Sequence, residues 1–308
     1  MRPLDYTTRE DILFAFDEQW SPQVGRDWHM TINNLFVKYD GERHLWPQYK
    51  TQQYLYAQAI GNPDAPRIPK PVDFFSDDSR SMSFMVMECV ELVPPPIADL
   101  PQRAAAALEW LRRVPVPSGV ILGRLGDGHP RHDIFDDYVS DHAFRSLAAL
   151  ERYLNHIVKL VLTRPRAEYK PYVKPVSISH EPLEFTQARM DSSNFRVDMD
   201  GRTCLFGFDF INVLPRSFAI WTMSNINVPF IAEVDKHLKW GRLDEYTVYT
   251  LANIRCRLVM SGGGKFGLDD DGYPVPRLGR GQTSSSGNAA QTSIPSSESN
   301  QSSELSSK

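Results

Sequence analysis

Three consecutive prolines at positions 94–96 constrain the fold of this chain more than any other feature. Proline cannot continue a helix or a central strand, so the triplet predicts a stiff, extended connector. Before it, runs rich in β-branched and aromatic residues predict strands, and one stretch with apolar residues at helical spacing predicts a helix. The predicted strands cover residues 31–39, 72–75 and 82–90, and the predicted helix covers residues 46–60. The chain should therefore begin with a small strand-rich region.

The segment after the connector is predicted to be mostly helical. Asp99 can cap a helix that includes residues 104–110, and apolar residues repeat at helical spacing over residues 144–162. Further along, the pair Asp200-Gly201 favours a tight turn between two strands. These two strands are expected at residues 195–199 and 203–210. The two parts of the chain together indicate an α+β fold with two lobes, a small antiparallel-sheet N-lobe and a larger helical C-lobe.

The domain boundaries follow from the same changes in composition. We expect the N-lobe at residues 1–93, the C-lobe at residues 94–260 and a Gly/Ser-rich tail at residues 261–308. The tail has few large aliphatic residues, so it cannot bury enough apolar surface to offset the entropy lost on ordering. We therefore predict that the tail is disordered.

Charge and composition exclude several classes of partner. A formal net charge of −4 at pH 7 gives no clustered basic face for nucleic acid. The N-terminal residues mix charged and apolar side chains, unlike a signal peptide, and no apolar run approaches the roughly 18 residues of a membrane span. The three cysteines lie far apart in the sequence without metal-ligand spacing. These features predict a cytoplasmic or nucleocytoplasmic protein with small molecules or other proteins as partners.

Two short loops contain residues that often carry chemistry. Residues 128–133 include two histidines and an aspartate, but their spacing suits no standard zinc site, so an exposed loop is expected. Residues 261–266 are similar to a phosphate-binding loop but lack the Ser or Thr after the lysine. A flexible exit from the helical region is the prediction there.

Five short stretches follow one another along the chain in an informative order: residues 35–39, 67–75, 84–88, 185–195 and 214–219. In this order they resemble the protein-kinase-like fold, and most closely the aminoglycoside phosphotransferase-like families of fungi. The resemblance implies a cleft that holds ATP and Mg²⁺ in line with an acceptor hydroxyl. It also implies that Lys38 contacts the phosphates, that Gln48 stands where a helix glutamate would hold this lysine, and that Glu88 lies at the nucleotide.

The same resemblance identifies catalytic positions that have lost their usual residues. The catalytic loop should offer an aspartate followed five residues later by a metal-binding asparagine; Asn194 is present, but the aspartate position is Arg189. A guanidinium has no acceptor and does not deprotonate, so it cannot be a general base. The metal-binding aspartate falls on Gly207, and the phosphate-covering loop has only Gly25 within residues 20–30. The chain should therefore be catalytically degenerate.

Two carboxylates offer a rearranged site. Asp191 and Asp209 each lie two residues beyond a vacant position, and on a strand that spacing means the same face. Asp191 would be a substitute base, and Asp209 would join Asn194 at the metal, although it would be displaced by about 7 Å along the strand. Alternatively, Asp209 pairs with Arg189, with Lys38 or with a surface partner, and an internal pair with Arg189 would fill the cleft with protein charge.

Three functions remain open from the sequence. The favoured one is a kinase-like pseudoenzyme that acts by binding or scaffolding, with protein partners and with a nucleotide as a further ligand. The second is an active ATP-dependent phosphotransferase of small molecules with a rearranged metal site. In the third, internal ion pairs close the cleft and no nucleotide binds. Resemblance of fold alone does not choose among them.

Overall fold

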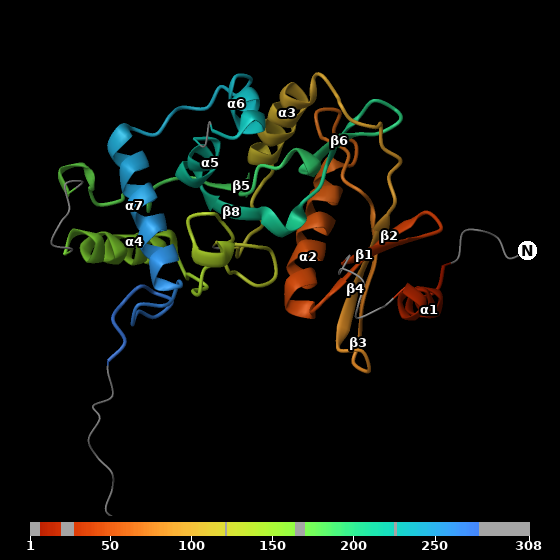
Figure 1. The fold of residues 1–308 in the computed structure, drawn as a ribbon, viewed down its shortest axis with the longest axis horizontal. Helices are drawn as coiled ribbons and strands as arrows, with labels where there is room; N and C mark the ends of the chain where they lie inside the picture. The colour runs from red at the N-terminus through yellow and green to blue at the C-terminus, as the bar shows by residue number, and fades with distance from the viewer. Residues whose placement is uncertain (1–6, 20–27, 121, 164–169, 225–226, 277–308) are drawn as a thin grey trace, which may run out of the picture. The chain divides into compact units, whose positions relative to one another are not determined.

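The structure is a computed structural model that describes residues 7–19, 28–120, 122–163, 170–224 and 227–276. The chain divides into a compact unit, Met1–Val275, and a second segment, Pro276–Lys308, of which only Pro276 lies within the described residues. In the described part, no helix is both long and apolar enough to cross a membrane. The compact unit contains strands and helices in the proportions of an α+β fold (Figure 1).

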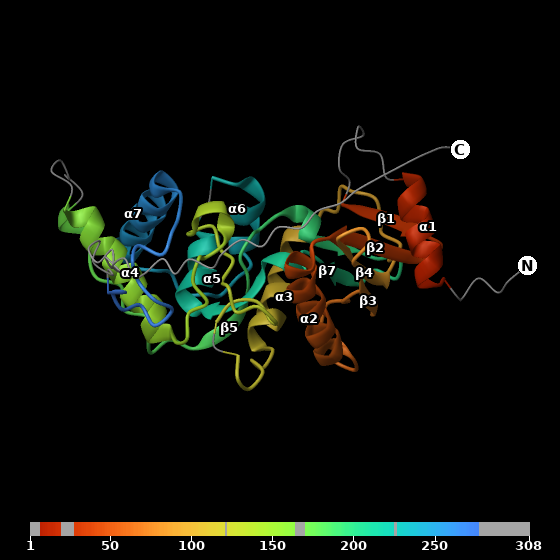
Figure 2. The same ribbon diagram turned by 90° about the horizontal axis from the view of Figure 1, so that it is seen from below.

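The N-terminal region contains a four-stranded antiparallel sheet with helices on both of its faces. Its elements are α1 (Arg9–Gln19), β1 (His29–Ile32), β2 (Leu35–Asp40), α2 (Glu42–Ala59), β3 (Pro71–Asp77) and β4 (Met82–Glu88), and the strand order is β1-β2-β4-β3. Alternate residues of a strand face opposite sides of a sheet. Phe84 and Val86 of β4 accordingly pack with Ile12 and Phe16 of α1, whereas Met85 and Met87 pack with Leu45 of α2. Figure 2 shows α1 and α2 on opposite sides of these strands.

Two expectations for this region need correction. Residues 31–39 are not one strand but the two strands of a hairpin, which turns at Asn33 with a φ of 53°. Asparagine tolerates this left-handed conformation because its short polar side chain can bond locally. The helix begins at Glu42 rather than Trp46, and Pro47 lies inside it. Proline usually interrupts a helix, so its presence in the first half concealed the true start.

The rest of the unit is mainly helical and has two short antiparallel pairs of strands, β5 with β8 and β6 with β7. The α-helices are α3 (Leu100–Arg113), α4 (Leu147–Leu162), α5 (Arg216–Met223), α6 (Pro229–Asp235) and α7 (Glu245–Ser261). The strands are β5 (Leu183–Gln187), β6 (Phe195–Val197), β7 (Thr203–Leu205) and β8 (Ile211–Pro215). The 3₁₀ turns are η1 (Asp136–Tyr138), η2 (Lys170–Tyr172), η3 (Ser192–Asn194) and η4 (Phe208–Phe210).

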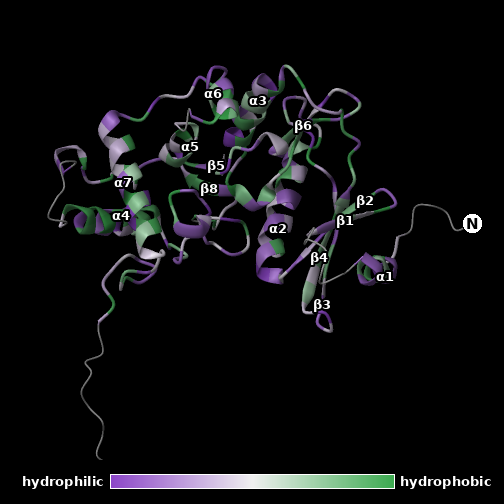
Figure 3. Cartoon of the chain, in the orientation of Figure 1, coloured by the Kyte–Doolittle hydropathy of each residue, from purple (hydrophilic) through white to green (hydrophobic). Residues whose placement is uncertain are grey.

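The helix expected at residues 144–162 is confirmed as α4, which begins after a Ser146 side chain that accepts a hydrogen bond from the Ala149 N–H. Hydrophobic and hydrophilic residues alternate around α4 in Figure 3, as expected of an amphipathic helix. Its apolar residues pack with α7 and with β8 in one core cluster. Asp99 precedes α3 as expected, but its side chain makes no capping bond and pairs with Arg103 instead.

The predicted hairpin around Asp200-Gly201 forms, but its second strand is shorter than expected. β7 ends at Leu205, Gly207 has a left-handed φ of 71°, and η4 follows immediately. Asp209 therefore lies in a 3₁₀ turn, so the prediction that it shares a strand face with position 207 is wrong. Glycine adopts a positive φ without the steric cost that other residues have, which explains why the strand stops here.

The compact unit also continues past residue 260, where the disordered tail was expected to begin. Leu268 is buried in the same cluster as α4 and α7. Gly262 ends α7 in a left-handed conformation, and the Gly264 N–H donates to Asp141. Residues 277–308 of the predicted tail lie outside the described residues.

Candidate functional site

A pocket of about 600 Å³ opens between the sheet and the segment that contains η3, β6 and η4. Its volume lies in the range of small-molecule sites. Its apolar lining includes Phe36, Met87, Leu92 and Phe208. Its polar and charged lining includes His29, Lys38, Glu88, Asn194, Arg196 and Asp209. The pocket therefore brings together four residues that the sequence singled out for an ATP and Mg²⁺ site, Lys38, Glu88, Asn194 and Asp209.

Lys38 lies on β2, one of the two inner strands of the sheet. Its Nζ lies 3.4 Å from Oε1 of Gln48 on α2, at the long limit of a hydrogen bond, and the Gln48 amide donates to the His44 carbonyl. Burial lowers the pKa of the Lys38 ammonium, and the Asp209 carboxylate partly offsets this effect. The Lys38 ammonium is thus partly buried without a carboxylate in ion-pair contact among the described residues, so its charged form disfavours the folded state.

Replacing Lys38 by methionine should stabilise the protein. A depressed lysine pKa means that the charged form disfavours folding at pH 7, so removal of the charge should raise the free energy of unfolding by about 1 kcal/mol. The gain should shrink as the pH rises toward the usual lysine pKa, where the wild-type side chain becomes neutral. Urea unfolding at pH 7 and pH 10 measures both effects. The control is Lys50→Met, because Lys50 lies on α2 and does not line the pocket. A Lys38→Met variant less stable than the wild type would contradict the interpretation.

Asn194 and Gly207 lie against each other in the pocket wall. A Cβ added to Gly207 would lie 2.4 Å from Oδ1 and 2.6 Å from Cγ of Asn194. The side-chain amide of Asn194 also donates to the backbone carbonyl of Arg189 at 2.9 Å, and the backbone carbonyl of Asn194 accepts from the Phe206 N–H. The side chain of Asn194 thus fills the space in which an aspartate at position 207 would begin. A Cβ at position 207 would therefore require the Asn194 side chain to move, and the left-handed φ of 71° independently favours glycine there.

Asp209 reaches the pocket, but Arg189 does not pair with it. The nearest guanidinium nitrogen is Nη1 of Arg131, 3.8 Å from Oδ2 of Asp209. The Arg189 guanidinium lies instead over the rings of Phe210 and Tyr138, at 5.3 Å and 5.6 Å from their centroids. The predicted Arg189 to Asp209 ion pair is therefore wrong, and Arg131 takes that place. Sequence spacing could not show this, because Arg131 lies in the loop that we had expected to be exposed.

The loop at residues 128–133 is largely packed against the helical region. His132 is fully buried and its Nε2 lies 2.9 Å from the Thr222 hydroxyl. The Arg131 N–H donates to the Asn212 side chain, and the Arg131 guanidinium is partly buried. Burial and the neighbouring Arg124 lower the pKa of Arg131, whereas Asp209 raises it. The exposed-loop prediction is wrong because a buried histidine and an asparagine on β8 fix the loop.

Asp191 lies at the edge of the site as a capping residue. Its carboxylate accepts a hydrogen bond from the Ser193 N–H at 2.9 Å at the start of η3. That bond, together with the Ser193 hydroxyl and the charge of Arg189, lowers the pKa of Asp191. Asp191 is exposed and does not line the pocket. A carboxylate with a lowered pKa is a weak base, so the role predicted for Asp191 gains no support from its surroundings.

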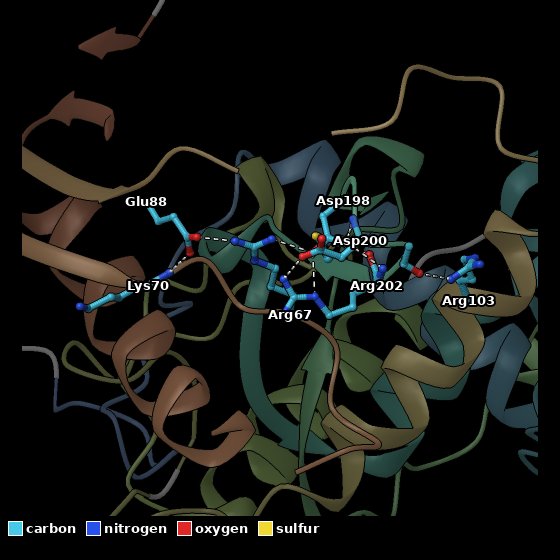
Figure 4. Close-up of polar contacts among 9 residues, drawn as sticks. Arg67, Lys70, Glu88, Arg103, Asp198, Asp200 and Arg202 are labelled. Carbon is cyan, nitrogen blue, oxygen red and sulfur yellow. Dashed lines mark hydrogen bonds and ion pairs between the residues drawn. The ribbon is translucent and has the colours of Figure 1, made fainter. Parts of the chain in front are cut away.

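Glu88 lines the pocket, but its carboxylate is bound to other parts of the chain. It accepts hydrogen bonds from the Arg67 guanidinium and from the Lys70 N–H. Figure 4 shows Arg67 between Glu88 and Asp198, and the second contact, from Arg67 Nη1 to Asp198 Oδ2, is 2.6 Å. The Arg67 backbone also pairs with Thr203 and Leu205 of β7. Arg67 thus joins the end of β4 to the β6–β7 hairpin, a role that local sequence patterns do not predict.

The residues of the pocket do not fit a divalent cation. Mg²⁺ prefers several oxygen ligands in a near-octahedral arrangement. Gly207 offers no side-chain oxygen, Asn194 offers only its Oδ1 because its amide N–H donates to the Arg189 carbonyl, and the Asp209 carboxylate faces Arg131 and Lys38. Within the described ranges, no three His, Cys, Asp or Glu side chains gather in a group that could hold a metal ion. The phosphate-covering loop expected around Gly25 lies outside the described residues.

Arg196 is a further pocket residue that sequence reasoning missed. It lies on β6 and lines the pocket next to Asn194. Its side chain has no hydrogen-bond or ion-pair partner among the described residues. The sequence pattern could have identified Arg196, because successive side chains of a strand point to opposite faces of the sheet. Phe195 and Val197 are buried, so Arg196 between them must face outward into the pocket.

No protein-family model matches the chain, and no curated protein matches its sequence. Solved structures do match its fold. A thermostable mutant of aminoglycoside phosphotransferase APH(4)-Ia in its apo form has 11% identity and a TM-score of 0.46, with 77% of this chain and 90% of that chain covered. The GDP complex of aminoglycoside 2′-phosphotransferase-IIIa has 13% identity and a TM-score of 0.45, over 82% and 93% of the two chains.

A third match is spectinomycin phosphotransferase APH(9)-Ia in complex with ADP and spectinomycin, with 9% identity and a TM-score of 0.44 over 75% and 77% of the two chains. All three are phosphotransferases of the class that the sequence resembles. Similarity at this level concerns the fold, so the function of this chain must be argued from its own residues. The chain is similar in fold to aminoglycoside phosphotransferases.

Proposed function

We propose that this chain is a kinase-like protein that binds a nucleotide without a divalent cation and does not transfer phosphate. The observation that carries the proposal is Gly207, which supplies no carboxylate to the pocket wall, while the Asn194 side chain lies where such a carboxylate would begin. Phosphoryl transfer depends on metal ions and on a residue that orients the acceptor. The pocket supports binding but lacks both of these parts.

The absence of a general base is independent support. Arg189 stands where the base is expected, and a guanidinium cannot accept a proton. Its charge faces two aromatic rings rather than the pocket. Loss of general-base catalysis alone typically removes about 10²- to 10⁴-fold in rate. Together with the missing metal ligand, this leaves a site suited to binding rather than turnover.

The apolar and the charged residues of the pocket suit the base and the phosphates of a nucleotide, respectively. Phe36, Met87 and Phe208 provide an apolar surface for a flat base. Lys38 and Arg196 provide two cations for phosphate oxygens, while the carboxylates of Glu88 and Asp209 are paired with arginines. Arg131 thus neutralises Asp209 in a position where a metal ion would otherwise be needed. We further propose that protein partners bind at the nucleotide-filled pocket or at the Ser-rich tail.

The proposal predicts that Lys38→Met and Arg196→Gln each weaken ADP binding about tenfold, because each removes a charge-assisted hydrogen bond worth about 1.5–3 kcal/mol. Calorimetric titration in EDTA measures the affinities, and Lys50→Met serves as the charge-matched control. Unchanged affinity in both pocket variants, or no saturable binding by the wild type, would contradict the proposal. A parallel assay should detect no transfer of the ATP γ-phosphate to hygromycin B, spectinomycin or water.

One observation favours the second candidate, an active phosphotransferase with a rearranged metal site. Asp209 lines the pocket together with Asn194, so a carboxylate and an amide oxygen are available on the same wall. In that case Asp209→Asn should weaken ATP binding in excess Mg²⁺, whereas our proposal predicts that the variant binds ATP in Mg²⁺ with equal or higher affinity than the wild type. The two candidates thus differ in the direction of one measurement.

A further inference from the structure

A second pocket of about 480 Å³ lies in the helical region, where α3 and α5 pack against β5 (Figure 1). It shares no lining residue with the first pocket. Its charged lining consists of Glu109, Arg112, Arg113, Glu184, Arg216 and Lys239. Four cations against two carboxylates leave a formal surplus of two positive charges, in a chain whose net charge is −4. Such a surplus in a concave site favours an anionic ligand.

The base of this pocket is rigid because a buried carboxylate fixes two of its arginines. Glu184 on β5 accepts from Arg112 Nε at 2.6 Å and from Arg216 Nη2 at 2.6 Å. Burial alone would raise the pKa of Glu184, but the hydrogen bonds from Arg112 and Arg216 lower it below its usual value. The carboxylate therefore stays charged and holds both guanidinium groups in place. Pre-organised donors of this kind lose little entropy when they bind a ligand.

Donors remain free around this fixed base. Arg113 donates only from Nε, to the Glu109 carbonyl, and Lys239 has no partner in the described part of the chain. The Arg112 guanidinium lies 4.3 Å from the ring centroid of Trp240. The Trp240 Nε1–H is buried and has no acceptor among the described residues, although nearly all buried polar groups in proteins have one. A neutral donor and several cationic donors with unused hydrogen-bonding capacity thus belong to residues that line the same pocket.

We propose that this second pocket binds a phosphate group, as the free dianion or as a phosphate monoester. A phosphate monoester carries about −1.5 to −2 charges at pH 7 and three acceptor oxygens. This charge matches the surplus of the pocket, and the oxygens match the free donors of Arg113, Lys239 and Trp240. Arginine forks bind phosphate in a bidentate manner, so Arg216 can add a nitrogen that Glu184 does not use. The site would allow the protein to respond to a phosphorylated metabolite independently of the nucleotide pocket.

Calorimetric titration with inorganic phosphate and with phenyl phosphate tests the proposal, with succinate as the dicarboxylate of equal charge. Saturable binding of both phosphates at pH 7.5, tighter than that of succinate, is expected. Arg113→Gln and Lys239→Gln should each weaken it about tenfold, because each removes a charged donor while the Arg112, Glu184 and Arg216 group stays intact. Folding of both variants can be checked by their unchanged unfolding midpoints.

Matched controls separate a specific site from general attraction. Lys236→Gln removes an exposed charge close in sequence that pairs with Glu233 and does not line the pocket, so it should leave the affinity unchanged. Lys38→Met should also leave it unchanged, because Lys38 lies in the first pocket. The proposal would be overturned by absent binding, by tighter succinate binding, by an equal loss in Lys236→Gln, or by a loss confined to Lys38→Met.

Discussion

Replacing Asp198 by alanine should destabilise the protein by about 3 kcal/mol. The Asp198 side chain is 1% exposed and accepts from Arg67 Nη1, Arg202 Nε and the N–H groups of Asp200 and Arg202. Removing one partner of a buried ion pair typically costs about 3–5 kcal/mol, because the remaining charge stays uncompensated. Arg67 and Arg202 are 22% and 55% exposed, so they recover some hydration and the loss should lie near the lower limit. Urea unfolding of the purified variant measures it.

The same hairpin provides a matched control. Asp200 also pairs with Arg202, but its side chain is 72% exposed, so Asp200→Ala should cost less than about 1 kcal/mol. Although burial acts to raise the pKa of Asp198, its bonds to Arg67 and Arg202 lower it. Its stabilising effect is therefore complete at neutral pH and declines as the pH falls below about 4, the usual range of aspartate. Equal losses in the two variants would contradict the central role of Asp198.

Replacing Gly207 by alanine should destabilise the protein by about 2 kcal/mol. The left-handed φ of 71° costs a non-glycine residue roughly 1–2 kcal/mol, and the new Cβ displaces the Asn194 side chain from its hydrogen bond to the Arg189 carbonyl, which adds about 1 kcal/mol. Gly207→Asp should suffer the same loss and should not restore metal-dependent binding. Thermal and urea unfolding, together with ATP titration in Mg²⁺, test both parts.

Gly201 separates the two causes. Its φ is 78°, but a Cβ at this position would meet nothing within 4 Å, so Gly201→Ala should show only the backbone cost. In a double-mutant cycle, Gly207→Ala combined with Asn194→Ala should recover at least about 1 kcal/mol, because the clash is removed. Additive effects in that cycle would show that Asn194 does not restrict position 207.

The repeating apolar patterns were sufficient to predict much of the fold. Strands β3 and β4, helices α3 and α4, and the turn at Gly201 were expected, because each is encoded by local spacing and turn chemistry. The same patterns missed the turn at Asn33 and the true end of β7 at Leu205. Both depend on residues in left-handed conformations, which alternation of polar and apolar residues does not reveal.

The candidate site was predictable only in part. Lys38, Asn194 and Asp209 were found because they fall at fixed offsets within short motifs, and they line one pocket. Arg131 and Arg67 were not found, because each lies far along the chain from its acidic partner, Asp209 and Asp198 respectively. Ion pairs between distant segments are set by tertiary packing, so no local spacing identifies them. The exclusion of a side chain at Gly207 likewise depends on where Asn194 packs.

The most direct test of the central claim is the affinity for ATP in excess Mg²⁺ compared with the affinity in EDTA, measured by calorimetry on the wild-type protein. We predict an affinity in EDTA that is equal or higher, because Lys38 and Arg196 attract free ATP more strongly than its magnesium complex. Affinity about tenfold higher in Mg²⁺ than in EDTA, lost again in Asp209→Asn, would show that the pocket binds a divalent cation and would contradict the account.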